Sequence, residues 1–156
     1  MGIRFAQAQD VAGILALLRQ VGRVHHEGRP DIFRPGAQKY GASQVLSLMD
    51  KPGTAIFIAV ENDAVLGYCF CMLKTHEKDP VIADYKELYI DDICVDEACR
   101  GQRIGKALYE AACRYARESH CYNVTLNVWS FNEGALRFYE SCGMKPQRIF
   151  METILE

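Results

Sequence analysis

The sequence predicts an α+β domain with a central mixed, mostly antiparallel β-sheet and flanking helices. Residues 54–61 and 65–75 are apolar and β-rich, and only a short polar turn separates them, which predicts a β-hairpin. From Tyr85 onward, strand-like and helix-like segments alternate in the order βαβαβ. A hairpin followed by such an alternation predicts a sheet that starts antiparallel and ends mixed.

Residues 1–53 are expected to form one short strand and two helices. Ile3 to Ala6 is strand-like, and Asp10 is placed to cap the first helix. The apolar residues of that helix recur at helical spacing: Val11, Ile14, Leu15, Leu17, Leu18 and Val21. The second helix is expected over Gln38 to Met49, because Lys51-Pro52-Gly53 follows it as a stop signal.

The segment from Val24 to Pro35 is rich in proline, glycine and charged residues. This composition predicts a surface loop, with Ile32 and Phe33 as buried anchors. Loops of this length often bind ligands.

The second half of the chain holds five further elements. The pattern predicts strands over Tyr85 to Val95, Val124 to Trp129 and Ile149 to Ile154, and helices over Arg103 to Glu118 and Asn132 to Ser141.

Composition indicates a single domain, residues 1–156, of an ordinary globular kind. The net charge of -2 gives no electrostatic reason to expect nucleic-acid binding. No apolar run approaches the roughly 18 residues that cross a bilayer, and the start lacks the apolar core of a signal peptide. A cytoplasmic protein without a membrane partner is therefore expected.

The seven cysteines lie mostly among apolar residues and form no C-x-x-C pair. None is clustered with histidines at the tight spacing of a zinc site. We expect free thiols and no structural metal.

The most informative segment runs from Asp91 to Leu108. A short apolar strand breaks at acidic residues and restarts as a helix through Arg100, Gly101 and Gly105. The first turn of a helix has N–H groups without partners and a partial positive charge, and glycine lets a ligand approach the backbone. This junction therefore predicts a site for phosphate or pyrophosphate.

The same residues resemble the acyl-CoA signature Arg/Gln-x-x-Gly-x-Gly/Ala of the GCN5-related N-acetyltransferase (GNAT) superfamily. Arg100, Ile104 and Gly105 match it, whereas Arg103 stands where the family more often has glycine. An arginine there keeps its N–H and adds a charged donor toward pyrophosphate.

A second segment strengthens the resemblance. Asn132-Glu-Gly-Ala-Leu-Arg-Phe-Tyr-Glu-Ser-Cys-Gly-Met is similar to the family's Asn-x-x-Ala-x-x-Phe-Tyr-x-x-x-Gly-Phe pattern, with Met144 in place of the last phenylalanine. Gly143 is a natural helix stop. The two motifs keep the order and context that the family gives them.

The resemblance implies acetyl-CoA as cofactor and a GNAT-like sheet in which strand Tyr89 to Val95 splays from the next strand. Backbone groups of the splayed strand would bind the pantetheine amides as an added strand does and supply an oxyanion donor. In the family the asparagine contacts pantetheine and the tyrosine lies near the sulfur. The implied cofactor-binding residues are Ile93, Cys94, Val95, Arg100, Gly101, Gln102, Arg103, Ile104, Gly105, Lys106, Asn132, Ala135 and Tyr139.

Acyl transfer from a thioester to an amine needs a neutral amine and a protonated leaving sulfur. A tyrosine holds its proton more tightly than a thiol, so Tyr139 is the expected general acid. Asp91 and Asp92 interrupt an apolar strand, and neighbours on a regular strand point to opposite faces. Asp92, on the face of Ile90 and Cys94, is the first candidate for the base.

Other assignments stay open for the proton acceptor. Glu87 is the second candidate, and a water relay ending on a backbone carbonyl is a third route. The two aspartates could instead be solvated at the strand end or pair with Arg100 or Arg103.

By resemblance, the acceptor enters between the Val24 to Pro35 loop and the hairpin end near Lys74 to Tyr85. The candidate acceptor residues are His25, Phe33, Tyr85 and Asp92, with His26, Glu27 and Asp31 nearby. Acidic side chains favour a cationic acceptor such as a polyamine, an aminoglycoside or a peptide amine. Trp129 and Phe131 are expected in the core or the cleft wall.

The leading hypothesis is an N-acetyltransferase that acts on an amine-bearing small molecule or peptide by direct attack in a ternary complex. The alternative is a noncatalytic acyl-CoA-binding sensor. A nucleotide-binding protein would need a Gly-Lys-Ser/Thr that this chain lacks, and an acyl-cysteine on Cys94 would need a nearby histidine. The resemblance also allows a homodimer through the final strand.

Overall fold

The computed structural model describes residues 1–156 and confirms the α+β class, with one five-stranded sheet in the order β1-β2-β3-β4-β5. Neighbouring strands are antiparallel except for β4 and β5, which are parallel. The elements are β1 (Gly2–Phe5), α1 (Val11–Gly28), α2 (Ala42–Asp50), β2 (Thr54–Glu61), β3 (Ala64–His76), β4 (Tyr85–Val95), α3 (Ile104–Glu118), β5 (Asn123–Leu126) and α4 (Glu133–Ser141), with single 3₁₀ turns at Ala8–Asp10 and Glu97–Cys99.

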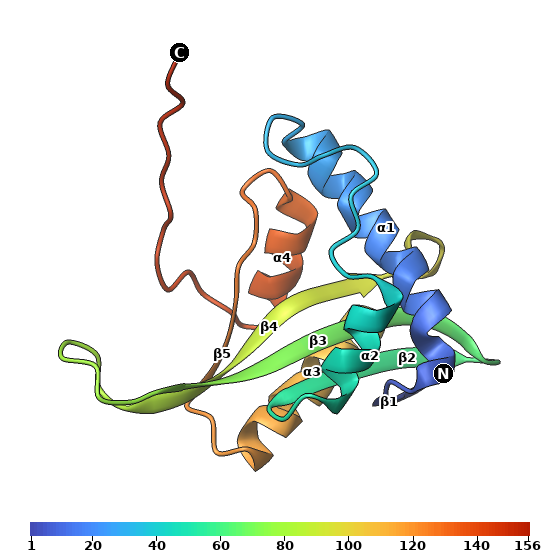
Figure 1. The fold of residues 1–156 in the computed structure, drawn as a ribbon, viewed down its shortest axis with the longest axis horizontal. Helices are drawn as coiled ribbons and strands as arrows, with labels where there is room; N and C mark the ends of the chain where they lie inside the picture. Colours follow the sequence, from blue (N-terminus) through green and yellow to red (C-terminus); the bar gives the residue numbers. More distant parts are fainter.

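Helices cover both faces of the sheet (Figure 1), which separates two apolar cores. One lies under α3 and includes Cys69, Cys71 and Ile90. The other lies under α1 and α2 and includes Tyr68, Phe70 and Cys94. Alternate residues of β3 therefore serve opposite cores, as the pleat requires.

A β-bulge interrupts the pairing of β3 with β4 at the two aspartates. Phe70 lies opposite Asp92 and Cys71 opposite Ile90, so Asp91 is the extra residue. The bulge inverts the alternation, and Ile90 and Cys94 consequently belong to different cores. The expectation that Asp92 shares a face with Ile90 is wrong, because it assumed a regular strand.

The hairpin and the strand Tyr85–Val95 form where they were expected. Asn62 and Asp63 close the β2–β3 hairpin with φ values of 48° and 62°, a left-handed turn that short polar residues tolerate. Helix α3 begins at Ile104 and α4 at Glu133, so Arg103 and Asn132 are their N-caps.

Helix α1 is longer than expected and ends at Gly28, since neither glycine nor proline interrupts Val24 to Glu27. The loop thus begins at Arg29, and His25 and His26 lie in the last helical turn. Phe33 is partly buried, but Ile32 is 46% exposed and is not an anchor. Helix α2 begins at Ala42 rather than Gln38.

Two strands of the second half differ from expectation. Strand β5 ends at Leu126, before Trp129, because it has no further partner on β4. Residues 149–154 form no strand; they are extended and lie away from the sheet (Figure 1). A strand needs a hydrogen-bonded neighbour, and none in the chain pairs with this segment. None of the helices combines the length and apolar character that a bilayer-spanning segment requires.

Candidate active site

The candidate site begins where β4 and β5 part. The two strands pair only between Glu87 and Ile90 of β4 and Asn123 and Leu126 of β5. Strand β4 continues to Val95 with β3 on one side and no strand on the other. Ile93, Cys94 and Val95, expected to bind through their backbone, lie on this free edge, which an extended ligand can complete.

The chain then passes through a tight turn into α3. Gly101 and Arg103 adopt left-handed conformations, with φ of 80° and 61°. The first backbone bond of the helix runs from the Ala107 N–H to the Arg103 carbonyl at 3.1 Å, which leaves the N–H groups of Ile104, Gly105 and Lys106 without backbone partners. This anion cradle, residues 100–106, has its basic side chains exposed.

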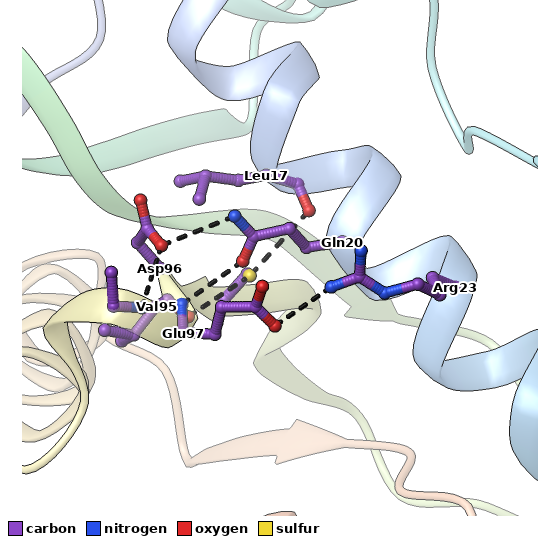
Figure 2. Close-up of polar contacts among 8 residues, drawn as sticks. Leu17, Gln20, Arg23, Val95, Asp96 and Glu97 are labelled. Atoms are coloured by element: carbon purple, nitrogen blue, oxygen red, sulfur yellow. Dashed lines mark hydrogen bonds and ion pairs between the residues drawn. The ribbon is translucent and has the colours of Figure 1, made fainter.

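Helix α1 contacts the turn that precedes the cradle and holds it in place (Figure 2). The Gln20 side chain accepts a hydrogen bond from the Glu97 N–H at 3.2 Å and donates one to Asp96 Oδ1 at 3.4 Å. Asp96 Oδ1 also accepts from the Ala98 N–H at 3.0 Å. Arg23 pairs with Glu97 at 2.9 Å, but both side chains are more than half exposed. Gln20 therefore fixes the turn between β4 and α3 through its side-chain hydrogen bonds. Arg23 adds a weaker ion pair at the surface.

Gly105 brings α4 onto the first turn of α3. A Cβ at this position would lie 3.2 Å from the Phe138 ring and 3.6 Å from Val95. The missing side chain allows Phe138 to pack there, and Tyr139 follows it on the same helix. Asn132 caps α4 by accepting from the Ala135 N–H at 3.2 Å through Oδ1, which leaves its side-chain amide N–H groups for a ligand.

Tyr139 is partly buried, and its hydroxyl makes no hydrogen bond to the protein. Burial, followed by the negative charge of Asp92, raises its pKa well above the usual value. The phenol therefore carries its proton at neutral pH and has it free for a ligand atom.

Asp92 accepts a hydrogen bond from the Tyr68 hydroxyl at 2.8 Å. Burial raises the pKa of Asp92, and the Tyr68 hydrogen bond and the charge of Lys39 partly oppose that increase. A carboxylate with a raised pKa is a better proton acceptor than one in water.

Asp91 is held on the same side of the sheet. It accepts from the Tyr40 hydroxyl at 2.6 Å and pairs with Lys39 Nζ at 3.0 Å. Tyr40 and Tyr68 both pack with the core under α1 and α2, so both carboxylates face that side. The two aspartates form no ion pair with Arg100 or Arg103. Sequence reasoning missed Lys39, Tyr40 and Tyr68, because nothing in the sequence marks distant residues as partners of β4.

Glu87, the second candidate base, already has several partners. Its carboxylate accepts from Thr125 Oγ1 at 3.2 Å and from the Tyr85 hydroxyl at 3.1 Å, and it lies 3.2 Å from His76 Nε2. Tyr85 also stacks on His76 at 4.4 Å. Tyr85 and Glu87 thus lie at the start of β4, whereas Asp92 lies near its end.

His25, Phe33, Trp129 and Phe131 form a group here called the aromatic cluster. His25 stacks on Phe33 at 4.8 Å, and Phe33 meets Trp129 edge to face at 5.0 Å. Burial and the charge of Lys39 lower the pKa of His25. The structure thus brings His25 and Phe33 together but places Tyr85 elsewhere. His26 contacts the Phe33 carbonyl, Asp31 pairs with Arg29, and Glu27 is exposed.

Cys94 is buried beside the free edge, and its thiol contacts the Leu17 carbonyl at 3.8 Å. Burial raises the pKa of Cys94 to about 12. A thiol with such a pKa is not ionised at neutral pH and is a poor nucleophile. The structure instead shows a free strand edge that leads into an anion cradle, with the Asp92 carboxylate on the same strand and the Tyr139 hydroxyl on the helix packed against α3.

Comparison with known proteins gives three findings. The sequence model described as the Acetyltransferase (GNAT) family matches residues 22–144. The chain is similar to glucosamine 6-phosphate N-acetyltransferases from Trypanosoma brucei brucei (39% identity over 57 residues, 36% of this chain) and Arabidopsis thaliana (35% over 68 residues, 44% of this chain). The matched segments span only 37% and 44% of those two relatives.

A solved structure resembles the chain over its whole length. It is the tetramutant of the BH1408 protein from Bacillus halodurans, which is 33% identical with a TM-score of 0.95. The match covers 99% of this chain and 100% of that one.

Proposed function

The chain belongs to the acetyltransferase (GNAT) family, and on that premise we propose that it transfers an acetyl group from acetyl-CoA to a primary amine of a small molecule or of a protein or peptide. The observation that carries this proposal is the free edge of β4 leading into the anion cradle at the start of α3, with α4, the helix that carries Tyr139, packed against the first turn of α3.

The residues present fit the coenzyme. Unpartnered N–H groups at Ile104, Gly105 and Lys106 suit a pyrophosphate, and the exposed arginines at 100 and 103 add charge. The free edge of β4 at Ile93, Cys94 and Val95 suits the amides of the pantetheine arm. Acetyl-CoA supplies an acyl group activated as a thioester.

The reaction is direct attack in a ternary complex. The amine nitrogen bonds to the acyl carbon while the carbon–sulfur bond breaks, so an amide and a thiol are formed. An alkyl amine is mostly protonated at neutral pH, and Asp92, directly or through water, takes the proton that must leave the nitrogen. Tyr139 donates its proton to the sulfur.

Two features of the site indicate which kind of acceptor it binds. Asp91 and Asp92 present carboxylates near the free edge, which favours an amine that arrives as a cation. The aromatic cluster provides a flat apolar wall on the acceptor side. An amino sugar is included among the candidate acceptors because two relatives act on glucosamine 6-phosphate.

The test is Tyr139→Phe, assayed by thiol release from acetyl-CoA with a panel of amines and N-terminal peptides. We expect turnover to fall by about 10²–10⁴-fold, since a positioned proton donor contributes that much. The affinity for CoA, measured by calorimetry, should stay within about 3-fold, because Tyr139 acts on the sulfur and not on the pyrophosphate. Tyr115→Phe, a packing tyrosine on α3, is the matched control.

The other outcomes define the alternatives. CoA binding without thiol release for any amine would favour the noncatalytic acyl-CoA sensor. Absence of CoA binding would refute both functions, because each depends on the cradle.

A further inference from the structure

Lys39, in the loop between α1 and α2, places its ammonium group against β4. Its Nζ donates a hydrogen bond to the Asp91 carbonyl at 3.1 Å and lies 3.0 Å from Asp91 Oδ2. The same atom is 5.7 Å from the centre of the Tyr40 ring, within the range of a cation–π contact. A carbonyl, a carboxylate and an aromatic ring together form a site for an alkylammonium group, and a lysine of the chain itself fills it.

This site lies where β4 and β5 part. The last pair between the two strands is Ile90 with Leu126, and Asp91 is the next residue of β4. Asp91 is also followed directly by Asp92, the proposed base. Burial raises the pKa of Asp92, and the charge of Lys39 is among the influences that oppose this increase. The Lys39 amine is therefore held at the start of the free edge, by the neighbour of the proposed base.

The loop before Lys39 is anchored on α1. The Ala37 carbonyl packs so closely on Gly22 that a Cβ there would lie 1.9 Å from its oxygen. Gln38 accepts a hydrogen bond from the Arg19 guanidinium at 3.2 Å. The Lys39 side chain itself is 45% exposed, so its amine stays accessible to a ligand. Lys39 is thus a positioned amine on a fixed loop.

We propose that Lys39 is a self-acetylation site, to which the chain transfers an acetyl group from acetyl-CoA. This inference rests on the proposed function, because the cradle and the free edge must bring the thioester to β4. Asp92, directly or through water, takes a proton from the ammonium group. The neutral Nζ then bonds to the acyl carbon while the carbon–sulfur bond breaks, and Tyr139 donates its proton to the sulfur. The products are an acetyl-lysine at position 39 and coenzyme A.

The modification changes the charge beside the base. An amide nitrogen carries no positive charge, so acetylation ends the ion pair between Lys39 and Asp91. The Asp91 carboxylate then keeps only the Tyr40 hydroxyl, at 2.6 Å, as a partner. The modified chain therefore presents to a cationic acceptor a carboxylate that the unmodified chain neutralises itself.

The test is mass spectrometry of the full chain incubated with acetyl-CoA and no added amine. We expect one acetyl group, located at Lys39 by peptide mapping, and a matching release of one thiol per chain. Acetylation should be at least about 100-fold faster at Lys39 than at Lys51, an exposed lysine after α2, because a positioned amine reacts faster than a free one. The fraction modified per unit time should not depend on protein concentration.

Two variants separate catalysed from unassisted acetylation. Asp92→Asn should slow the reaction at Lys39 by about 10²–10⁴-fold and leave Lys51 unchanged. Lys39→Arg keeps a cation beside Asp91, so it should bind CoA as the wild type does but release no thiol without an added amine. Equal rates at Lys39 and Lys51, or a Lys39 rate that survives Asp92→Asn, would overturn the proposal.

The remaining outcomes separate this inference from the proposed function. A fractional rate that rises with protein concentration would show that one copy modifies another and would overturn self-acetylation. Absence of acetylation at Lys39 would also overturn it. In that case, thiol release with an added amine would leave the proposed function intact, whereas silence across the amine panel would remove both.

Discussion

Asp92 and Tyr139 come from elements that are far apart in sequence, yet the negative charge of Asp92 adds to the effect of burial in raising the pKa of Tyr139. The ionised Asp92 helps to hold the proton on Tyr139, and burial keeps both groups from ordinary solvation. The environment of each group, and not its residue type alone, sets the pKa that suits it to act as base or as acid. The Tyr68 hydroxyl, bonded to Asp92 at 2.8 Å, keeps the carboxylate oriented.

Asp92→Asn tests the residue as a base and as a buried charge. We expect turnover to fall by about 10²–10⁴-fold. We also expect a higher free energy of unfolding at pH 7, because the raised pKa of Asp92 means that the folded state resists its ionisation. The amide oxygen of asparagine can still accept from Tyr68.

The pH dependence of this stability difference has a definite sign. A folded-state pKa above the unfolded value of 3.8 makes wild-type stability fall as the pH rises through the interval between them. The advantage of Asp92→Asn should therefore shrink below about pH 4 in urea titrations, where the wild-type carboxyl is protonated in both states. Asp50→Asn, an exposed carboxylate on α2, is the control. An advantage that grew toward acid pH would refute this account of Asp92.

At the scale of elements, the junction between β4 and α3 contains a strained residue and is held in place by hydrogen bonds from α1. Arg103 has a left-handed backbone, which costs a residue with a Cβ about 1–2 kcal/mol. Gln20 on α1 fixes the preceding turn through hydrogen bonds with Asp96 and Glu97. The cradle is therefore maintained by a helix from the other end of the chain.

Arg103→Gly and Arg103→Ala separate backbone strain from charge. Glycine should be more stable than alanine here by about 1 kcal/mol in urea unfolding, because only glycine relieves the left-handed strain. Both variants lose the guanidinium, so both should bind CoA more weakly than the wild type and to a similar extent. Equal stability of the two variants would show that the backbone at 103 is not strained.

Gln20→Leu tests the support from α1. Loss of its hydrogen bonds to the turn should weaken CoA binding by about 10-fold, the equivalent of 1.4 kcal/mol. Arg23→Ala removes only an exposed ion pair of the same helix and should change the affinity by less than about 3-fold. Calorimetric titration of both variants checks this, and an equal loss in the two would argue against a special role for Gln20.

At the scale of the whole molecule, the sheet is incomplete on its β5 side. Strands β4 and β5 part, and one edge of β4 is free beyond Ile90. The two apolar cores hold the rest of the sheet, so ligand contacts are added to a fold that is already packed. The coenzyme should therefore stabilise the molecule without reorganising it.

CoA at about 100 times its dissociation constant should stabilise the fold by about 2.7 kcal/mol. For a chain of this size that corresponds to a rise in Tm of about 5–10 °C. Scanning calorimetry measures the rise, and hydrogen exchange should slow for the amides between Asp91 and Val95. Adenosine, which lacks the pyrophosphate and the pantetheine arm, should give a much smaller shift. An unchanged Tm with CoA would argue against the cradle.

The sequence by itself determined the features that consecutive residues encode. The hairpin, strand Tyr85–Val95 and the turn into α3 depend on local alternation, polar turns and glycine placement, and all three formed as expected. The motifs at Arg100–Gly105 and Asn132–Met144 are contiguous, so the family could be predicted from them.

Tertiary structure alone decided which way the aspartates face and what they contact. A bulge exists only relative to the partner strand, and here it moves Asp91 and Asp92 to the same side of the sheet, where Tyr40 and Tyr68 meet them from distant parts of the chain. Residues 149–154 show the same limit of prediction from sequence. Their sequence is strand-like, but a strand forms only when another edge accepts its hydrogen bonds, and that edge is a property of the assembled molecule.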